Sequence, residues 1–166
     1  MNFKVIIALL SYILFTSCTT INKNSPVIDK NLINPGQSAE GFSIGESFED
    51  NSNKINKNGS IADILNVDCF SELKFDSFVY NKDSSILFLN NGIITAIVGL
   101  KTDRRVTTDA VLLSNGIDNF ILNYGNKGLL TIRKGNHCVY LYKKLGIAIF
   151  NDNNDGSIDM YLIFKN

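Results

Sequence analysis

Two stretches of this chain, residues 78–88 and 140–150, resemble each other and constrain the fold more than any other feature. Each has the composition of a β-strand that runs into a second apolar strand and then a glycine turn. The matched positions are Tyr80 with Tyr142 and Phe88 with Phe150, and the two stretches lead into turns at Asn91-Gly92 and Asp155-Gly156. The chain is therefore predicted to contain a tandem duplication.

The predicted fold is α+β, with two degenerate helix-plus-antiparallel-sheet repeats at residues 41–103 and 104–166. In the first repeat, Ser47 is able to cap a helix that would end at Gly59, although many asparagines weaken it. In the second, apolar residues recur at helical spacing over residues 117–124, and a glycine ends the run. Further strands are expected at residues 129–133, 137–142, 147–150 and 157–164.

The strongest local signal is a β-hairpin at Asn91-Gly92, because this pair tolerates the positive φ angles of a tight type I′ turn. Apolar residues 86–89 and 93–100 flank it. The second of these segments is apolar on both alternations, so both of its faces should be covered and the strand should be central. Residues 61–65 predict a short helical turn.

Residues 1–17 have the layout of a secretory signal, with Lys4 followed by an apolar run and then small residues. A cysteine directly after such a run resembles the lipobox of bacterial lipoproteins, which implies a lipidated Cys18. The usual leucine three residues before the cysteine is Phe15 here. Ordinary export, with Cys18 inside the removed segment, is the alternative.

Residues 18–40 are rich in Asn, Ser, Lys, Pro and Gly and are predicted to be a flexible tether. Together with a lipid anchor at Cys18, such a tether would hold the domain at a membrane surface of the cell envelope.

A Gly-bounded apolar entry, a helix that ends in glycine and strands that close in a glycine hairpin are together similar to the repeat of the SmpA/OmlA (BamE) lipoproteins. Two such repeats in tandem resemble the beta-lactamase inhibitory protein fold. The resemblance covers roughly residues 41–166 and implies protein binding at a bacterial envelope without catalysis. The first repeat departs from the pattern, because it has only Asn58-Gly59 at the expected helix end.

The charge balance argues against nucleic acid as a partner. The chain has 16 basic and 16 acidic residues. Removal of residues 1–17 takes away only Lys4, so the exported chain would have a net charge of −1. No basic cluster is present, and nucleic-acid-binding surfaces depend on such clusters.

Cys69 and Cys138 would lie in an oxidising compartment after export. They could form a disulfide, or they could be two buried free thiols. They do not occupy equivalent positions in the two matched stretches.

The acidic turn at residues 151–159 has some features of a calcium-binding loop. Asn153, Asp155 and Asp159 fall at positions where such a loop places oxygen ligands. The twelfth position, which needs a bidentate acid, is Leu162. An ordinary hairpin turn is therefore favoured over a calcium site.

No residue set indicates catalysis, and no cofactor is expected. His137 is the only histidine and is adjacent to Cys138 on a predicted strand, so their side chains should point to opposite faces. A pair of Cys69 with His137 stays geometrically open. No nucleophile elbow, phosphate loop or dinucleotide fingerprint is present.

The aromatic residues Phe78, Tyr80, Tyr140 and Tyr142 are the candidate partner-binding residues, unless they belong to the core. Residues two apart on a strand lie on one face, and tyrosine suits a surface that is partly wet. The sequence thus favours a non-enzymatic envelope lipoprotein that binds another envelope protein through its sheet face. The alternative is a small-ligand carrier or an enzyme with a pocket between the repeats.

Overall fold

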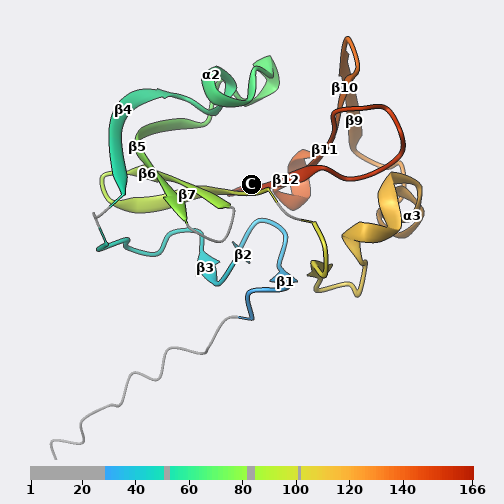
Figure 1. Cartoon of the computed structure of the whole chain (residues 1–166), viewed down its shortest axis with the longest axis horizontal. Helices are drawn as coiled ribbons and strands as arrows, with labels where there is room; N and C mark the ends of the chain where they lie inside the picture. Colours follow the sequence, from blue (N-terminus) through green and yellow to red (C-terminus); the bar gives the residue numbers. More distant parts are fainter. Residues whose placement is uncertain (1–28, 51–52, 82–84, 101) are drawn as a thin grey trace, which may run out of the picture.

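Eight of the described strands form one antiparallel sheet (Figure 1). The computed structural model describes residues 29–50, 53–81, 85–100 and 102–166. The strand order is β4-β5-β6-β7-β12-β11-β10-β9. The strands are β4 (Lys54–Ser60), β5 (Lys74–Asn81), β6 (Ser85–Asn90), β7 (Ile93–Gly99), β9 (Leu129–Lys134), β10 (His137–Tyr142), β11 (Ile147–Asn151) and β12 (Met160–Phe164).

Short elements cover the two faces of this sheet. The helices are α2 (Ile61–Leu65) and α3 (Gly116–Tyr124). The short strands are β1 (Leu32–Ile33), parallel to β8 (Val106–Thr107), and β2 (Ser38–Ala39), antiparallel to β3 (Phe42–Ser43). Three 3₁₀ turns complete the described part of the chain: η1 (Asp68–Phe70), η2 (Leu113–Asn115) and η3 (Lys143–Leu145).

The predicted hairpin and central strand are confirmed. Asn91 and Gly92 have φ angles of 52° and 75°, which are the two positive values that a type I′ turn needs. β7 lies between β6 and β12, and its Ile97 and Val98, which point to opposite faces, are both fully buried. The short helix at residues 61–65 and the helix that ends at Gly125 are also present.

Each face of the sheet carries its own hydrophobic core. The face covered by α3 and the N-terminal segment (residues 29–45), here called the α3 face, buries Ile33, Leu87, Ile97, Phe120, Tyr142 and Tyr161. The opposite face, here called the α2 face, buries Ile61, Phe70, Phe75, Phe88, Phe150 and Leu162. In Figure 1, α2 lies above the sheet, and β1 to β3 lie below it.

The predicted α+β fold of two helix-plus-sheet repeats is wrong, because the protein is mostly β. Ser47 caps no helix and instead forms a bridge with Ile93. The asparagine-rich residues that follow form strand β4, because their backbone groups pair with β5. The two helices also occupy different places: α2 follows β4, whereas α3 precedes β9, and they cover opposite faces.

The predicted match of Tyr80 with Tyr142 is shifted by one residue in the structure. Ile86 and Ala148 each lie two residues before the matched phenylalanines of β6 and β11. The strand partner of Ile86 is Tyr80, but the partner of Ala148 is Leu141. Because side chains alternate between faces, this shift places Tyr80 on the α2 face and Tyr142 on the α3 face.

The expected tether is shorter than residues 18–40. Residues 29–40 belong to the folded part, since β1 pairs with β8 and both Ile33 and Ala39 are fully buried. Ile33 and Ala39 belong to the core of the α3 face. The predicted signal peptide (residues 1–17) and Cys18 lie outside the described residues.

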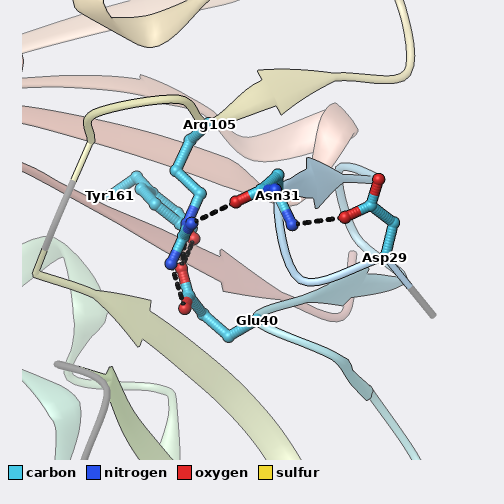
Figure 2. A network of polar contacts seen from close by, with 5 residues as sticks. All are labelled: Asp29, Asn31, Glu40, Arg105 and Tyr161. Carbon is cyan, nitrogen blue, oxygen red and sulfur yellow. Dashed lines mark hydrogen bonds and ion pairs between the residues drawn. The ribbon is translucent and has the colours of Figure 1, made fainter.

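A buried polar network holds the N-terminal segment on the α3 face (Figure 2). Glu40 occupies the tight turn between β2 and β3, with φ of 56°, and is 4% exposed. Its carboxylate accepts two hydrogen bonds from Arg105, at 2.6 Å from Nε and 2.7 Å from Nη2, and a third from the Tyr161 hydroxyl. Arg105 Nη1 also donates to Asn31 Oδ1 at 2.8 Å. One carboxylate thus joins three distant segments of the chain.

The surroundings keep Arg105 and Tyr161 in the protonated forms that donate to Glu40. Hydrogen bonds to the Glu40 carboxylate raise the pKa of the Arg105 guanidinium. Burial and the negative charge of Glu40 raise the pKa of Tyr161, so its hydroxyl stays protonated and donates. The Tyr161 ring lies over Gly99 of the neighbouring strand, where a Cβ atom would overlap the ring.

Replacement of Glu40 by alanine is expected to destabilise the fold by about 3–5 kcal/mol, because it leaves the Arg105 charge buried without its partner. Urea unfolding of Glu40→Ala and of the wild type would measure this difference. Glu72→Ala is the matched control: its 3.3 Å ion pair with Lys143 is solvent-exposed, so stability should change little. Equal stability of Glu40→Ala and wild type would contradict a structural role for the network.

Candidate functional site

The α2 face carries a groove of about 630 Å³. One wall is formed by α2 and η1, and the other by the β9–β10 hairpin. In Figure 1 both α2 and this hairpin rise above the sheet, with α2 to the left of the hairpin. The lining residues are Ile64, Leu65, Asn66, Val67, Asp68, Cys69, Tyr80, Ile86, Leu100, Ile132, Arg133, Lys134, His137, Val139, Phe150, Asp152 and Met160.

The floor of the groove is apolar because it is part of the second core. Ile86, Val139 and Phe150 project from β6, β10 and β11 into this face. α2 has only five residues, too few to cover all of these strands. These floor residues are themselves buried, and the accessible apolar surface of the groove belongs to partly buried residues around them, such as Leu65, Ile132 and Met160.

Polar side chains line the rim. Lys134 Nζ donates to Asn66 Oδ1 at 2.9 Å, and this contact bridges the two walls. His137 Nδ1 lies 3.0 Å from Asp152 Oδ1. These residues place charge around the apolar floor rather than on it.

The α2 wall is held in place by local hydrogen bonds. The backbone N–H of Ser60 donates to Asp63 Oδ2 at 2.7 Å, as in a capping box. This hydrogen bond lowers the pKa of Asp63. The helix then ends at Asn66, which takes the left-handed conformation with φ of 54° and directs its side chain to Lys134.

The structure separates the four aromatic residues that the sequence selected as partner-binding. Phe78 and Tyr142 are buried in the cores of opposite faces. Tyr140 is half-buried against the α3 face. Tyr80 alone among them is well exposed, at 50%, and it lines the groove.

Tyr142 is part of the core on the α3 face. Its hydroxyl donates to the carbonyl of Gly125 at 2.8 Å, and its ring packs against Phe120 and Tyr124. Burial also raises the pKa of Tyr142. The residue thus fixes the end of α3 to the sheet.

Cys69 and Cys138 are free thiols in the structure. Cys69 packs against the core of the α2 face. Cys138 lies on the other side of β10, because it alternates with Val139, which belongs to that core. The sheet lies between the two sulfur atoms, so this fold does not form the disulfide that the sequence left open.

Cys69 and His137 both line the groove, but no hydrogen bond joins them among the contacts of the described residues. His137 is instead paired with Asp152. Burial raises the pKa of the Cys69 thiol to about 11, which is the opposite of what an activated nucleophile needs. The arrangement therefore gives no activated thiol among the described residues of the groove.

The acidic turn between β11 and β12 is closed by its own hydrogen bonds. Asp155 Oδ1 accepts from the Ser157 hydroxyl at 2.6 Å, the Ser157 backbone N–H at 2.9 Å and Asn151 Nδ2 at 3.1 Å. The two bonds from Ser157 lower the pKa of Asp155. Asp159 accepts from the backbone N–H of Asp152 at 2.7 Å. These contacts support the hairpin interpretation over a calcium site with Asn153, Asp155 and Asp159.

Within the described residues, no three His, Cys, Asp or Glu side chains form a group that could hold a metal ion. None of the helices in the same part of the chain is long and apolar enough to cross a membrane. Comparison with protein-family models, curated proteins and solved structures finds no match to this chain.

Most of the groove could not be predicted from the sequence. Ile132, Met160 and Leu65 lie far apart in the chain and have the appearance of ordinary core residues in a sequence. The positive charge of Lys134, at the C-terminal end of β9, is the one local sign of a rim. Only the pairing of Lys134 with His137 shows that Lys134 lies on the α2 face.

Alkylation of Cys69 by iodoacetamide is expected to be slow at neutral pH and to rise steeply as the pH approaches 11. A pKa of about 11, in place of the ordinary value near 9, lowers the reactive thiolate fraction about a hundredfold below pH 9. Peptide mapping by mass spectrometry between pH 7 and 11 would measure the rate. A half-maximal rate near pH 9 would contradict this assignment.

The raised pKa also has a consequence for stability. The pKa of Cys69 is higher in the folded state, so the unfolded chain loses this proton first as the pH rises. The contribution of the Cys69 thiol to the free energy of unfolding is therefore complete below pH 9 and declines as the pH rises toward 11.

Proposed function

We propose that this chain is a non-enzymatic binding module of the cell envelope and that it binds an apolar segment of another envelope protein in the groove on its α2 face. The observation that supports this proposal most strongly is the apolar lining of the groove, where Ile64, Leu65, Ile132 and Met160 pack against the core but are only partly buried. Exposed apolar surface with a polar rim is typical of interaction sites. Tyr80 at the margin is the kind of residue that anchors such contacts.

The chemistry of the groove favours binding over catalysis. The thiol of Cys69 has a raised pKa, and His137 is paired with Asp152 rather than with a nucleophile. Nucleophilic catalysis needs a nucleophile with a base within hydrogen-bonding reach, and general-base catalysis needs a base that is free to take the proton. The groove offers shape and apolar area instead.

A small-ligand carrier is the second candidate function. The groove volume of about 630 Å³ lies in the range of small-molecule sites. Its lining comes from both halves of the chain, with Ile64 and Tyr80 on one side and Ile132 and Met160 on the other. An apolar small molecule would use the same floor as a protein segment.

We further propose that the protein is exported and attached to a bacterial membrane through a lipidated Cys18. The support is the apolar run of residues 5–15, which ends just before this cysteine. Two or more acyl chains would give stable anchoring. The docked N-terminal segment would then leave residues 19–28 as the connection between the anchor and the sheet.

A photo-reactive benzoylphenylalanine at position 80 is expected to crosslink to the occupant of the groove in intact cells. Tyr80 is aromatic and 50% exposed, so the larger aromatic side chain has room at the margin of the groove. A discrete protein adduct, identified by mass spectrometry, would support the protein-binding function. An adduct of small mass would instead support the carrier.

The matched control carries the same group at Leu122, which is 81% exposed on α3 and is not part of the groove lining. Adducts made at position 80 should be missing at position 122. The proposal fails if both positions give the same adducts, or if position 80 gives none.

Cys18→Ala is expected to move the protein from the membrane fraction to the soluble fraction, since the acyl chains would have no attachment site. Fractionation of cells followed by immunoblotting would measure the distribution. Cys69→Ala, which changes a cysteine within the folded part, is the control and should stay with the membrane. Retention of Cys18→Ala in the membrane would contradict the proposed anchor.

A further inference from the structure

Strand β9 ends the sheet and has no partner on its outer edge among the described residues. All six of its residues pair with β10 without a bulge. A straight edge of this kind presents unpaired backbone N–H and C=O groups in a regular row. Leu130 is 51% exposed on this strand. The edge is therefore a template for another strand.

The opposite edge of the sheet, strand β4, is protected against pairing with another strand, whereas β9 is not. β4 contains a register shift between Asn56 and Gly59, and it carries Lys54 and Lys57. Bulges and lysines are the usual features that prevent edge-to-edge pairing. β9 lacks a bulge, and its two cationic residues are both at its C-terminal end.

We propose that β9 is a contact between two copies of this chain, which pair antiparallel through this strand about a twofold axis at Thr131. In this register, Thr131 lies opposite Thr131 of the second copy, and each Leu130 lies opposite Ile132 of the other copy. Leu130 and Ile132 both point to the α2 face, because their partners in β10 are Leu141 and Val139. Directly opposite residues share a face, so both apolar pairs lie on that side.

The distribution of charge favours a second copy as the occupant of this edge. Arg133 and Lys134 lie at one end of the strand. Antiparallel pairing places Arg133 opposite Leu129 of the second copy, whereas parallel pairing would bring identical cations together. Like charges opposite each other destabilise strand pairs. The strand therefore complements itself in one orientation only.

The twofold pairing also closes the assembly. Each copy uses the unprotected edge of its eight-stranded sheet, and the β4 edges lie outermost, so the contact produces a dimer rather than a fibre. The α2 faces of both copies lie on the same side of the joined sheet. This inference rests on β9 and does not depend on what the groove binds.

The test uses full-length Thr131→Lys and Thr131→Glu, which place like charges opposite each other at the twofold axis. Each variant alone should dimerise about tenfold more weakly or worse than the wild type, because directly opposed like charges disfavour pairing. A mixture of the two should recover the dimer, since a lysine then lies opposite a glutamate at the axis. Light scattering after gel filtration would measure the molar mass.

Asn56→Lys and Asn56→Glu are the matched controls, because Asn56 is exposed on the other edge strand. They should leave the dimer unchanged, alone or mixed. A wild type that stays monomeric at every concentration overturns the proposal. A dimer that withstands both Thr131 variants overturns it as well.

A second measurement covers the case in which a charged variant fails to fold. Full-length Thr131→Cys should form a disulfide between the two copies under mild oxidation, because directly opposite strand residues lie within disulfide distance. Mass spectrometry would identify the linkage between position 131 of each copy. Asn56→Cys should give no such linkage. Absence of the 131–131 linkage in folded protein would overturn the proposed register.

Discussion

The bidentate ion pair between Glu40 and Arg105 is the interaction on which the α3 face depends. Glu40 comes from the tip of the β2–β3 turn, and Arg105 comes from the connection after β7. Tyr161 donates the third hydrogen bond from β12, a strand at the centre of the sheet. A buried charge is costly unless it is paired, so the three segments must dock together or not at all. The N-terminal segment is thereby fixed as part of the core.

The two faces of the sheet are covered by elements of different size. The N-terminal segment and α3 close the α3 face, where residues such as Ile97 and Ile147 are fully buried. The α2 face has only a five-residue helix and a 3₁₀ turn above it in the described part of the chain. The groove follows from this imbalance. Its position between α2 and β9–β10 also places it beside the unprotected edge of the sheet.

Local signals in the sequence predicted local structure well. Asn91-Gly92 forms the expected hairpin turn, since few other residue pairs accept two positive φ angles. Apolar spacing indicated the helix that ends at Gly125, and a run apolar on both faces indicated the central strand β7. The error in the repeat came from the connection before the matched phenylalanine of β11, which contains one residue more than its counterpart. One residue is enough to move Tyr142 to the other face.

The sequence by itself determined the positions of most strands, the main turns and the apolar run that precedes Cys18, because these depend on residues adjacent in the chain. The tertiary structure decided which face each side chain occupies, that residues 29–40 are folded, and that a groove remains between α2 and β10. Strand register and the burial of Glu40 depend on partners distant in the chain, and Arg105 is 65 residues away from Glu40. No local pattern encodes those pairings, since they arise only when the strands meet.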